Sequence, residues 1–291
     1  MPFDPDPAAS STPDDSPIDL EGAPVSWPPL PAGLPGPVGI PPSGTTPGRP
    51  PPGLLDVLLP WSALTGGPAA EPAALGRIGP VTPSQVRQLI GLATHHPGTV
   101  WRLLLIDDDG YAQAIERIRV RGSPADQIRA GPPTTPVIGR MTVTISASAV
   151  SRDQHNGGTG LRASLLRAAA RAAGRVQARQ VADTAAGGCA HRGATTAYRP
   201  GPRLREFVVA RDGTCTFPPC GQPAWRADLD HTLPWHLGGP TCACNLSAGC
   251  RTHHKIKQLP DWKLDQPQPG ILRWTTPAGR SYTVQPNRYP S

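Results

Sequence analysis

Two stretches of the chain carry apolar side chains at helical spacing. Residues 82–94 show this spacing after Thr82 and Pro83, and a capping residue followed by proline is typical of a helix start. Residues 160–182 are rich in Ala, Leu and Arg and predict a second, longer helix. Its arginines repeat every four positions, at Arg167, Arg171, Arg175 and Arg179. Such a stripe either grips phosphates or forms a solvated helix face, and the pattern alone leaves both open.

Strand-like runs lie between and before these helices. Residues 100–106 are mostly apolar, an Asp-Gly turn follows, and residues 111–120 complete a predicted hairpin, although this second arm also suits a short helix. Residues 140–150 alternate between apolar and polar side chains and predict a further strand. The apolar run at 54–59 suits either a strand or one helical turn.

The C-terminal part of the chain mixes short predicted elements. A short helix is expected over residues 204–210, and a hairpin over 271–284 with Pro277-Ala278-Gly279 in its turn. Trp262 and this hairpin are expected to cover a small core. The sequence as a whole therefore predicts an α+β fold.

Composition divides the chain further. It has 291 residues with 40 prolines and 32 glycines, and 17 of the prolines fall in residues 1–53, which we expect to be disordered because they cannot bury enough surface to offset chain entropy. We expect a small helix and hairpin region at 54–121, a linker with one strand and the arginine-rich helix at 122–202, and a separate domain at 203–291.

Charge is distributed unevenly along the chain. The net charge of +7 arises from −6 in residues 1–60, +8 in residues 61–200 and +5 in residues 201–291. A basic body favours a polyanion such as nucleic acid, although a GC-rich genome that encodes arginine often would give the same balance. Neither a secretory signal nor an apolar run of transmembrane length is visible, which predicts a cytoplasmic protein without membrane contact.

Five of the six cysteines fall within 36 residues, which in a cytoplasmic chain indicates metal binding rather than disulfides. Two pairs have the spacing and donor types of a closed tetrahedral zinc site: Cys215 with Cys220, and Cys250 with His253. If residues 246–257 are helical, the second pair lies one turn apart on one face. A set of buried free thiols is the alternative.

Four further candidates are less clear. Cys242 and Cys244 could replace one of the two pairs, so which four residues bind zinc stays open. Cys189 and His191 have no partners at metal-binding spacing, and we assign them no role.

A second metal seat is indicated by Asp230 and His254. Asp230 is a hard oxygen ligand, and His254 lies about 100° further round a helix than its neighbour, so it can face a different site. The two residues could hold Mg²⁺ or a similar ion, which leaves His231 free to act as a general base.

These residues, in this order, resemble the HNH, or ββα-metal, nucleases. The motif consists of Asp230-His231, Asn245 fourteen residues on, and His254 nine further, with Lys257 after it. The resemblance implies that His231 is the general base and that Asp230 and His254 hold the catalytic metal. It also implies that Asn245 fixes the loop that orients His231, and the cysteine pairs match the zinc-bearing branch of the family.

The resemblance implies a small zinc-stapled fold at the C-terminus. Two short strands would surround Asp230-His231, a loop would span 234–241, and a helix would carry residues 250–257. Three basic residues near the site would contact phosphates: Arg251, Lys255 and Lys257.

A wider likeness extends over residues 203–288 and 78–120. These stretches look like parts of the actinobacterial repeat-family proteins that pair a helical domain of unknown function with a C-terminal HNH module. The bulk of the helical domain is replaced here by the proline-rich residues 1–53.

The leading hypothesis is therefore a metal-dependent endonuclease acting on nucleic acid, most simply double-stranded DNA. A zinc-stapled nucleic-acid-binding module without cleavage is the alternative, and an inactive mobile-element remnant is a third. The target sequence, DNA versus RNA, nicking versus double-strand cutting, and the oligomeric state stay open.

Overall fold

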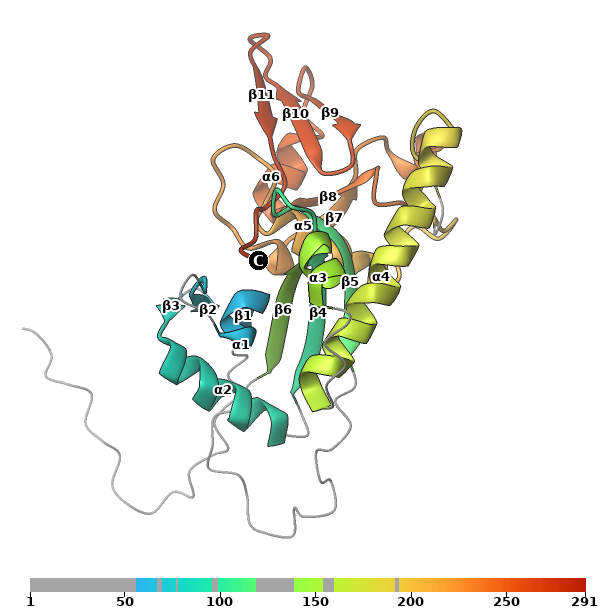
Figure 1. Ribbon diagram of the computed structural model, residues 1–291. Helices are drawn as coiled ribbons and strands as arrows, with labels where there is room; N and C mark the ends of the chain where they lie inside the picture. The colour runs from blue at the N-terminus through green and yellow to red at the C-terminus, as the bar shows by residue number, and fades with distance from the viewer. Residues whose placement is uncertain are drawn as a thin grey trace, which may run out of the picture. The chain divides into compact units, whose positions relative to one another are not determined.

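The computed structural model describes residues 56–66, 70–76, 78–95, 99–118, 139–153, 160–191 and 194–291. The segment expected to be disordered, 1–53, and the Gly/Pro-rich stretch 122–137 lie outside these residues. The described part is a mixed α and β structure with a six-stranded, a three-stranded and a two-stranded sheet (Figure 1), which confirms the α+β prediction at this level.

The strands are β1 (Asp56–Pro60), β2 (Ala73–Leu75), β3 (Gly79–Val81), β4 (Val100–Ile106), β5 (Ala112–Ile118), β6 (Arg140–Ser146), β7 (Asp228–His231), β8 (Leu246–Gly249), β9 (Lys263–Gln268), β10 (Ile271–Thr275) and β11 (Ser281–Val284). The α-helices are α1 (Trp61–Thr65), α2 (Pro83–His95), α3 (Ala147–Asp153), α4 (Gly160–Ala185), α5 (Pro202–Asp212) and α6 (Arg251–Ile256). Two 3-10 turns complete the set, η1 (Ala224–Arg226) and η2 (Trp235–Leu237).

The largest sheet has the strand order β3-β2-β1-β6-β4-β5. Strand β6 pairs in parallel with both β1 and β4, whereas the other neighbours are antiparallel. Strands β4 and β6 are buried on both faces from their second residue onward, which explains their apolar runs. Strand β6 and helix α4, which we expected in a linker region, are instead parts of this core.

Two local predictions are confirmed in this region. Helix α2 begins directly after Thr82, and Thr82 and Gln85 cap it reciprocally. The Thr82 hydroxyl accepts a hydrogen bond from the backbone N–H of Gln85 at 3.4 Å, and the Gln85 side-chain oxygen accepts one from the backbone N–H of Thr82 at 2.9 Å. Strands β4 and β5 form the predicted hairpin, in which Asp107 accepts hydrogen bonds from the turn.

Helix α4 covers one face of the sheet. It runs alongside β5 (Figure 1) and inserts its apolar stripe among the alternate side chains of β4 and β6 that point the same way. Leu165, Ala169 and Ala172 are fully buried there. On the same helix Arg175 pairs with Glu116 and Arg179 donates to the Gln113 carbonyl, so part of the arginine stripe is bound to the sheet.

Helix α5 and the end of the chain cover the opposite face. Leu104 and Ile106 of β4 pack against Ala210 of α5, with Phe207 and Tyr289 at the edge. The Tyr289 amide also donates to the Gly110 carbonyl at 2.9 Å. The last residues therefore return to the first sheet after the C-terminal hairpin.

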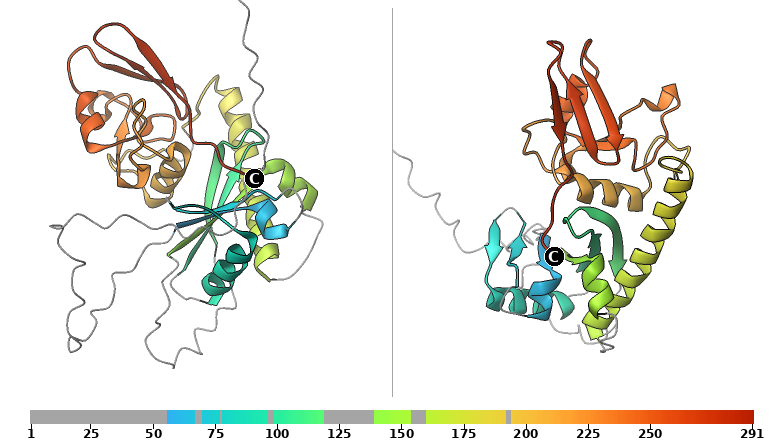
Figure 2. Two further views of the ribbon diagram at one scale, coloured as in Figure 1. Left: turned by 90° about the vertical axis from the view of Figure 1, so that its left-hand side faces the viewer. Right: turned by 45° about the horizontal axis from the view of Figure 1, so that its top comes forward.

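The C-terminal part builds three elements in close succession. Antiparallel strands β7 and β8 place His231 opposite Leu246, and helix α6 follows β8 after a single residue, Cys250. Residues 246–249 form a strand, so the helix predicted from 246 begins later. A three-stranded sheet, β11-β10-β9, follows (Figure 2), in which β10 and β11 are the predicted hairpin and β9 was not predicted.

A buried pair fastens α5 to β8. Asp212, at the end of α5, accepts from the Ala248 amide at 2.8 Å and from Arg211 Nε at 2.7 Å. Arg211 in turn donates to the Leu246 carbonyl at 2.7 Å. Strand β8 is therefore held by charged hydrogen bonds, which are stronger than neutral ones.

None of the helices in the described ranges is both long enough and apolar enough to cross a membrane.

Candidate active site and metal centres

The predicted zinc residues lie together in the structure. The donor atoms of Cys215, Cys220, Cys250 and His253 all lie within 4.8 Å of one another. His253 Nδ1 is 3.2 Å from Cys250 Sγ and 3.5 Å from Cys215 Sγ. Sulfur and nitrogen bound to one tetrahedral zinc ion are separated by about 3.6 Å, so the spacing suits this metal.

Local structure explains how these four side chains meet. Cys215 and Cys220 lie in a loop after α5 that is closed by a bridge between Thr214 and Pro223. Cys250 is the N-cap of α6, and its amide donates to Cys215 Sγ at 3.2 Å. His253 follows within the first turn.

An aromatic group fixes the His253 ring. Phe217 stacks on it with ring centroids 3.9 Å apart and planes 5° from parallel, and Trp274 meets Phe217 edge-on at 5.1 Å. Trp274 Nε1 donates to the Thr216 carbonyl at 2.7 Å, which ties strand β10 to the cysteine loop. Burial lowers the pKa of His253 and so favours the neutral ring, the form that binds metal.

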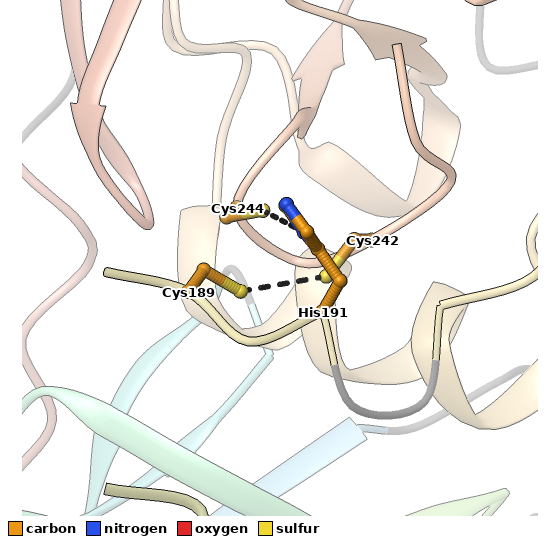
Figure 3. A group of neighbouring side chains, drawn as sticks. All are labelled: Cys189, His191, Cys242 and Cys244. Carbon is orange, nitrogen blue, oxygen red and sulfur yellow. Dashed lines mark hydrogen bonds between the residues drawn. The ribbon is translucent and has the colours of Figure 1, made fainter. Parts of the chain in front are cut away.

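Cys242 and Cys244 do not join this set. They lie with Cys189 and His191 in a second Cys/His group, whose donor atoms are also within 4.8 Å of one another (Figure 3). Sequence reasoning missed this group, although each half, Cys-x-His and Cys-x-Cys, is a pair with one intervening residue.

The predicted catalytic-metal ligands converge at the end of β7. His254 Nε2 lies 3.6 Å from Asp230 Oδ1, and both side chains are largely buried. The other ring nitrogen of His254 is 3.1 Å from Asp228 Oδ2, a contact that lowers the pKa of Asp228. Asp228 was not predicted, and it orients the His254 ring so that Nε2 faces Asp230.

Lys257 is part of this site rather than a free phosphate contact. Its ammonium lies 2.7 Å from Asp230 Oδ2 and also donates to the His231 carbonyl. Arg251 forms an exposed pair with Asp228 at 3.4 Å. Of the three predicted phosphate-binding residues, Lys255 alone forms no ion pair with another described residue, and its side chain is exposed.

His231 is oriented by a short chain of hydrogen bonds. Its Nε2 lies 2.8 Å from Thr241 Oγ1, and the Thr241 hydroxyl donates to the Ala197 carbonyl at 2.8 Å. A hydroxyl has one proton, so Thr241 must accept from His231 Nε2–H. This assigns the proton to Nε2 and leaves Nδ1 as the acceptor, the arrangement that a general base requires.

The surroundings keep the His231 ring neutral and covered. Burial is the main cause of a lowered His231 pKa, with Asp230 opposing it and Lys257 adding to it. Tyr198 stacks on the ring with centroids 5.5 Å apart, and only 3% of His231 is exposed. Thr241 and Tyr198 were not predicted, since neither belongs to the recognised motif.

Asn245 closes the loop that joins β7 to β8. Its Oδ1 accepts from the Leu233 amide at 2.7 Å, and its Nδ2 donates to the carbonyls of Leu233 and Pro240, both at 3.0 Å. The side chain is buried and makes contacts at both ends of the loop. This is the loop-fixing geometry that the resemblance implied for Asn245.

Comparisons with known proteins find similarity over only part of the chain. No family model and no solved structure matches it. It is 47% identical over 91 residues to the uncharacterized protein Rv3776 of Mycobacterium tuberculosis, an alignment that covers 31% of this chain and 17% of the relative. The uncharacterized protein Rv2100 of the same organism is 47% identical over 90 residues, 31% of this chain and 16% of the relative. The chain is thus similar, over less than a third of its length, to short stretches of much longer mycobacterial proteins.

Proposed function

We propose that this protein is a metal-dependent endonuclease of the HNH type. The observation that carries the proposal is the convergence of Asp230 Oδ1 and His254 Nε2, 3.6 Å apart, beside a neutral histidine whose Nδ1 is the proton acceptor. Both ligands lie on the β7-β8-α6 unit, the strand–strand–helix order of a ββα-metal site.

The donor set fits a divalent ion. A carboxylate oxygen and an imidazole nitrogen 3.6 Å apart can both reach one ion at about 2.1 Å. Such an ion would supply positive charge to the phosphate under attack. Because one donor is a nitrogen, Mn²⁺, Ni²⁺ and Zn²⁺ are candidates beside Mg²⁺.

The chain's own residues then have separate tasks. His231 takes a proton from the attacking water through Nδ1, and Thr241 holds the ring in the required tautomer. Lys257 holds the second oxygen of Asp230, which leaves Oδ1 facing His254. Asn245 keeps the loop that carries Thr241 in place.

Exposed side chains around the site suit nucleic acid. Tyr198, which stacks on His231, meets Trp235 edge to face. The two side chains are 57% and 45% exposed, so they can stack with bases. Arg251 and Lys255 are exposed on α6 and can contact phosphates.

One observation favours a binding module without cleavage. Tyr198 stacks on His231, which is only 3% exposed, whereas a general base must reach water at the phosphate. In the nuclease, Tyr198 has to move aside when nucleic acid binds, whereas a binding module needs no such movement.

Plasmid nicking decides between these functions. The purified chain is incubated with supercoiled DNA and each divalent ion in turn, and His231→Ala is compared with the wild type. We expect His231→Ala to lower cleavage about 10²- to 10⁴-fold, because proton abstraction is removed. His236→Ala removes an exposed histidine from the loop that follows β7 and serves as the control.

Zinc content and DNA affinity are measured on the same samples. They should not change in His231→Ala, because the predicted zinc ligands are Cys215, Cys220, Cys250 and His253, and DNA affinity comes from arginine and lysine side chains. A wild type that binds DNA but never cuts it replaces this proposal with the binding module. If the His231→Ala variant cuts as fast as the wild type, His231 is not the general base.

A further inference from the structure

We propose that Cys189, His191, Cys242 and Cys244 form a second, closed tetrahedral zinc site. The Sγ atoms of Cys189 and Cys242 are 3.8 Å apart, and His191 Nδ1 lies 3.3 Å from Cys244 Sγ. Figure 3 shows the four side chains turned toward one another from two separate segments. The site is additional to the predicted zinc site and independent of the nuclease proposal.

The separation of Cys189 and Cys242 is the one that zinc requires. Two sulfurs at about 2.3 Å from one tetrahedral ion are about 3.8 Å apart, as Cys189 and Cys242 are. A disulfide would bring the same atoms to about 2.05 Å. Three thiolates and one imidazole fill all four positions, which is typical of a structural rather than a catalytic site.

The backbone at His191 supports a ligand role. His191 has a φ of +52°, and Asp261 is the only other non-glycine residue of the described ranges with a positive φ. Such a conformation is uncommon and destabilising unless something holds it. His191 is also exposed, so packing does not hold it, whereas a bond from Nδ1 to zinc would.

The site lies where the hydrophobic core gives little support. The last turns of α4 extend beyond the sheet core, and Val181 there is 67% exposed. Residues after the helix are held by polar contacts, such as the Ala190 amide donating to Asp183 at 2.8 Å. A metal ion would join this segment to the loop before β8 where apolar packing does not.

The same link reaches the proposed active site. Cys242 follows Thr241, whose carbonyl accepts from the Thr195 amide at 3.2 Å and whose hydroxyl donates to Ala197. Zinc between residues 189–191 and 242–244 would therefore hold the segment that carries Tyr198 against His231. This second role rests on the proposed function, but the metal site does not.

Metal content tests the site directly. The full-length chain is purified and dialysed against a chelator strong enough to remove an ion held by only two protein ligands, such as one at Asp230 and His254. Its zinc content is then measured by mass spectrometry. We expect two zinc ions per chain for the wild type and one for His191→Ala. His191→Cys should restore the second ion because zinc accepts four thiolates. The control His236→Ala should keep both.

Three further measurements keep the outcome clear. Circular dichroism checks that His191→Ala folds, as expected for an exposed side chain. Cobalt titration should give a thiolate-to-metal absorption band that falls by half in Cys189→Ser/Cys242→Ser, and all six cysteines should react with a thiol reagent after unfolding without reductant.

Three results would overturn the proposal: one zinc ion in the wild type, two retained in His191→Ala, or four reactive thiols, which would mean a disulfide. None of these depends on cleavage, so the metal site and the nuclease activity fail or succeed separately.

Discussion

Truncating Asn245 should destabilise the protein measurably, because one buried side chain holds both ends of a long loop. Asn245→Ala removes three hydrogen bonds, to the Leu233 amide, the Leu233 carbonyl and the Pro240 carbonyl. A net contribution of about 1 kcal/mol per bond gives a loss of about 3 kcal/mol in the free energy of unfolding. Asn245→Asp should be at least as destabilising, because it places a carboxylate oxygen against two carbonyls.

Urea unfolding of the zinc-loaded protein, followed by tryptophan fluorescence, measures this loss. Gln258→Ala is the matched control, since it truncates an exposed amide and should change the unfolding free energy by less than about 0.5 kcal/mol. Cleavage should fall as well, because Thr241 lies in the loop and orients His231. If Asn245→Ala unfolds at the same urea concentration as Gln258→Ala, the loop is held by something else and the reasoning fails.

Three further changes follow from the structure. Cys215→Ala should abolish the fold of the C-terminal part and release one zinc ion, because a structural zinc contributes folding free energy directly; unchanged circular dichroism and metal content would contradict this. Gly239→Ala should be destabilising by more than about 2 kcal/mol in urea titrations, since its Cβ would lie 1.9 Å from a backbone carbonyl oxygen, whereas Gly221→Ala meets nothing within 4 Å and should be neutral. Leu165→Ala should lower the free energy of unfolding by about 2–5 kcal/mol, because Leu165 is fully buried. Val181→Ala should change it little, because Val181 is 67% exposed, and equal effects of the two substitutions would contradict the packing of α4 against the sheet.

Local signals in the sequence predicted local structure well. The Thr82 cap, the Asp-Gly turn and the arginine-rich helix each depend on neighbours within a few residues. The Cys215/Cys220 and Cys250/His253 pairs were recognisable because each pair has a familiar spacing.

Long-range pairings were not predictable in the same way. Nothing near residues 140–146 indicates that this strand lies between two parallel neighbours, since parallel pairs join distant segments. Cys189 and Cys242 are 53 residues apart and each belongs to a two-residue fragment of a ligand set. Asp228 and Thr241 were missed for a different reason, because they contact His254 and His231 but do not belong to the recognised motif.

The C-terminal tail connects the C-terminal part of the chain to the six-stranded sheet a second time, in addition to the segment between α4 and α5. Tyr289 donates to the Gly110 carbonyl at 2.9 Å, and the Ser291 carbonyl accepts from Ser62 at 2.7 Å. A chain cut between residues 194 and 201 would therefore still be joined through the tail, through the apolar contact around Leu104, and through the second Cys/His group. Produced as separate polypeptides, the two pieces are expected to reassemble on mixing, with zinc strengthening the complex.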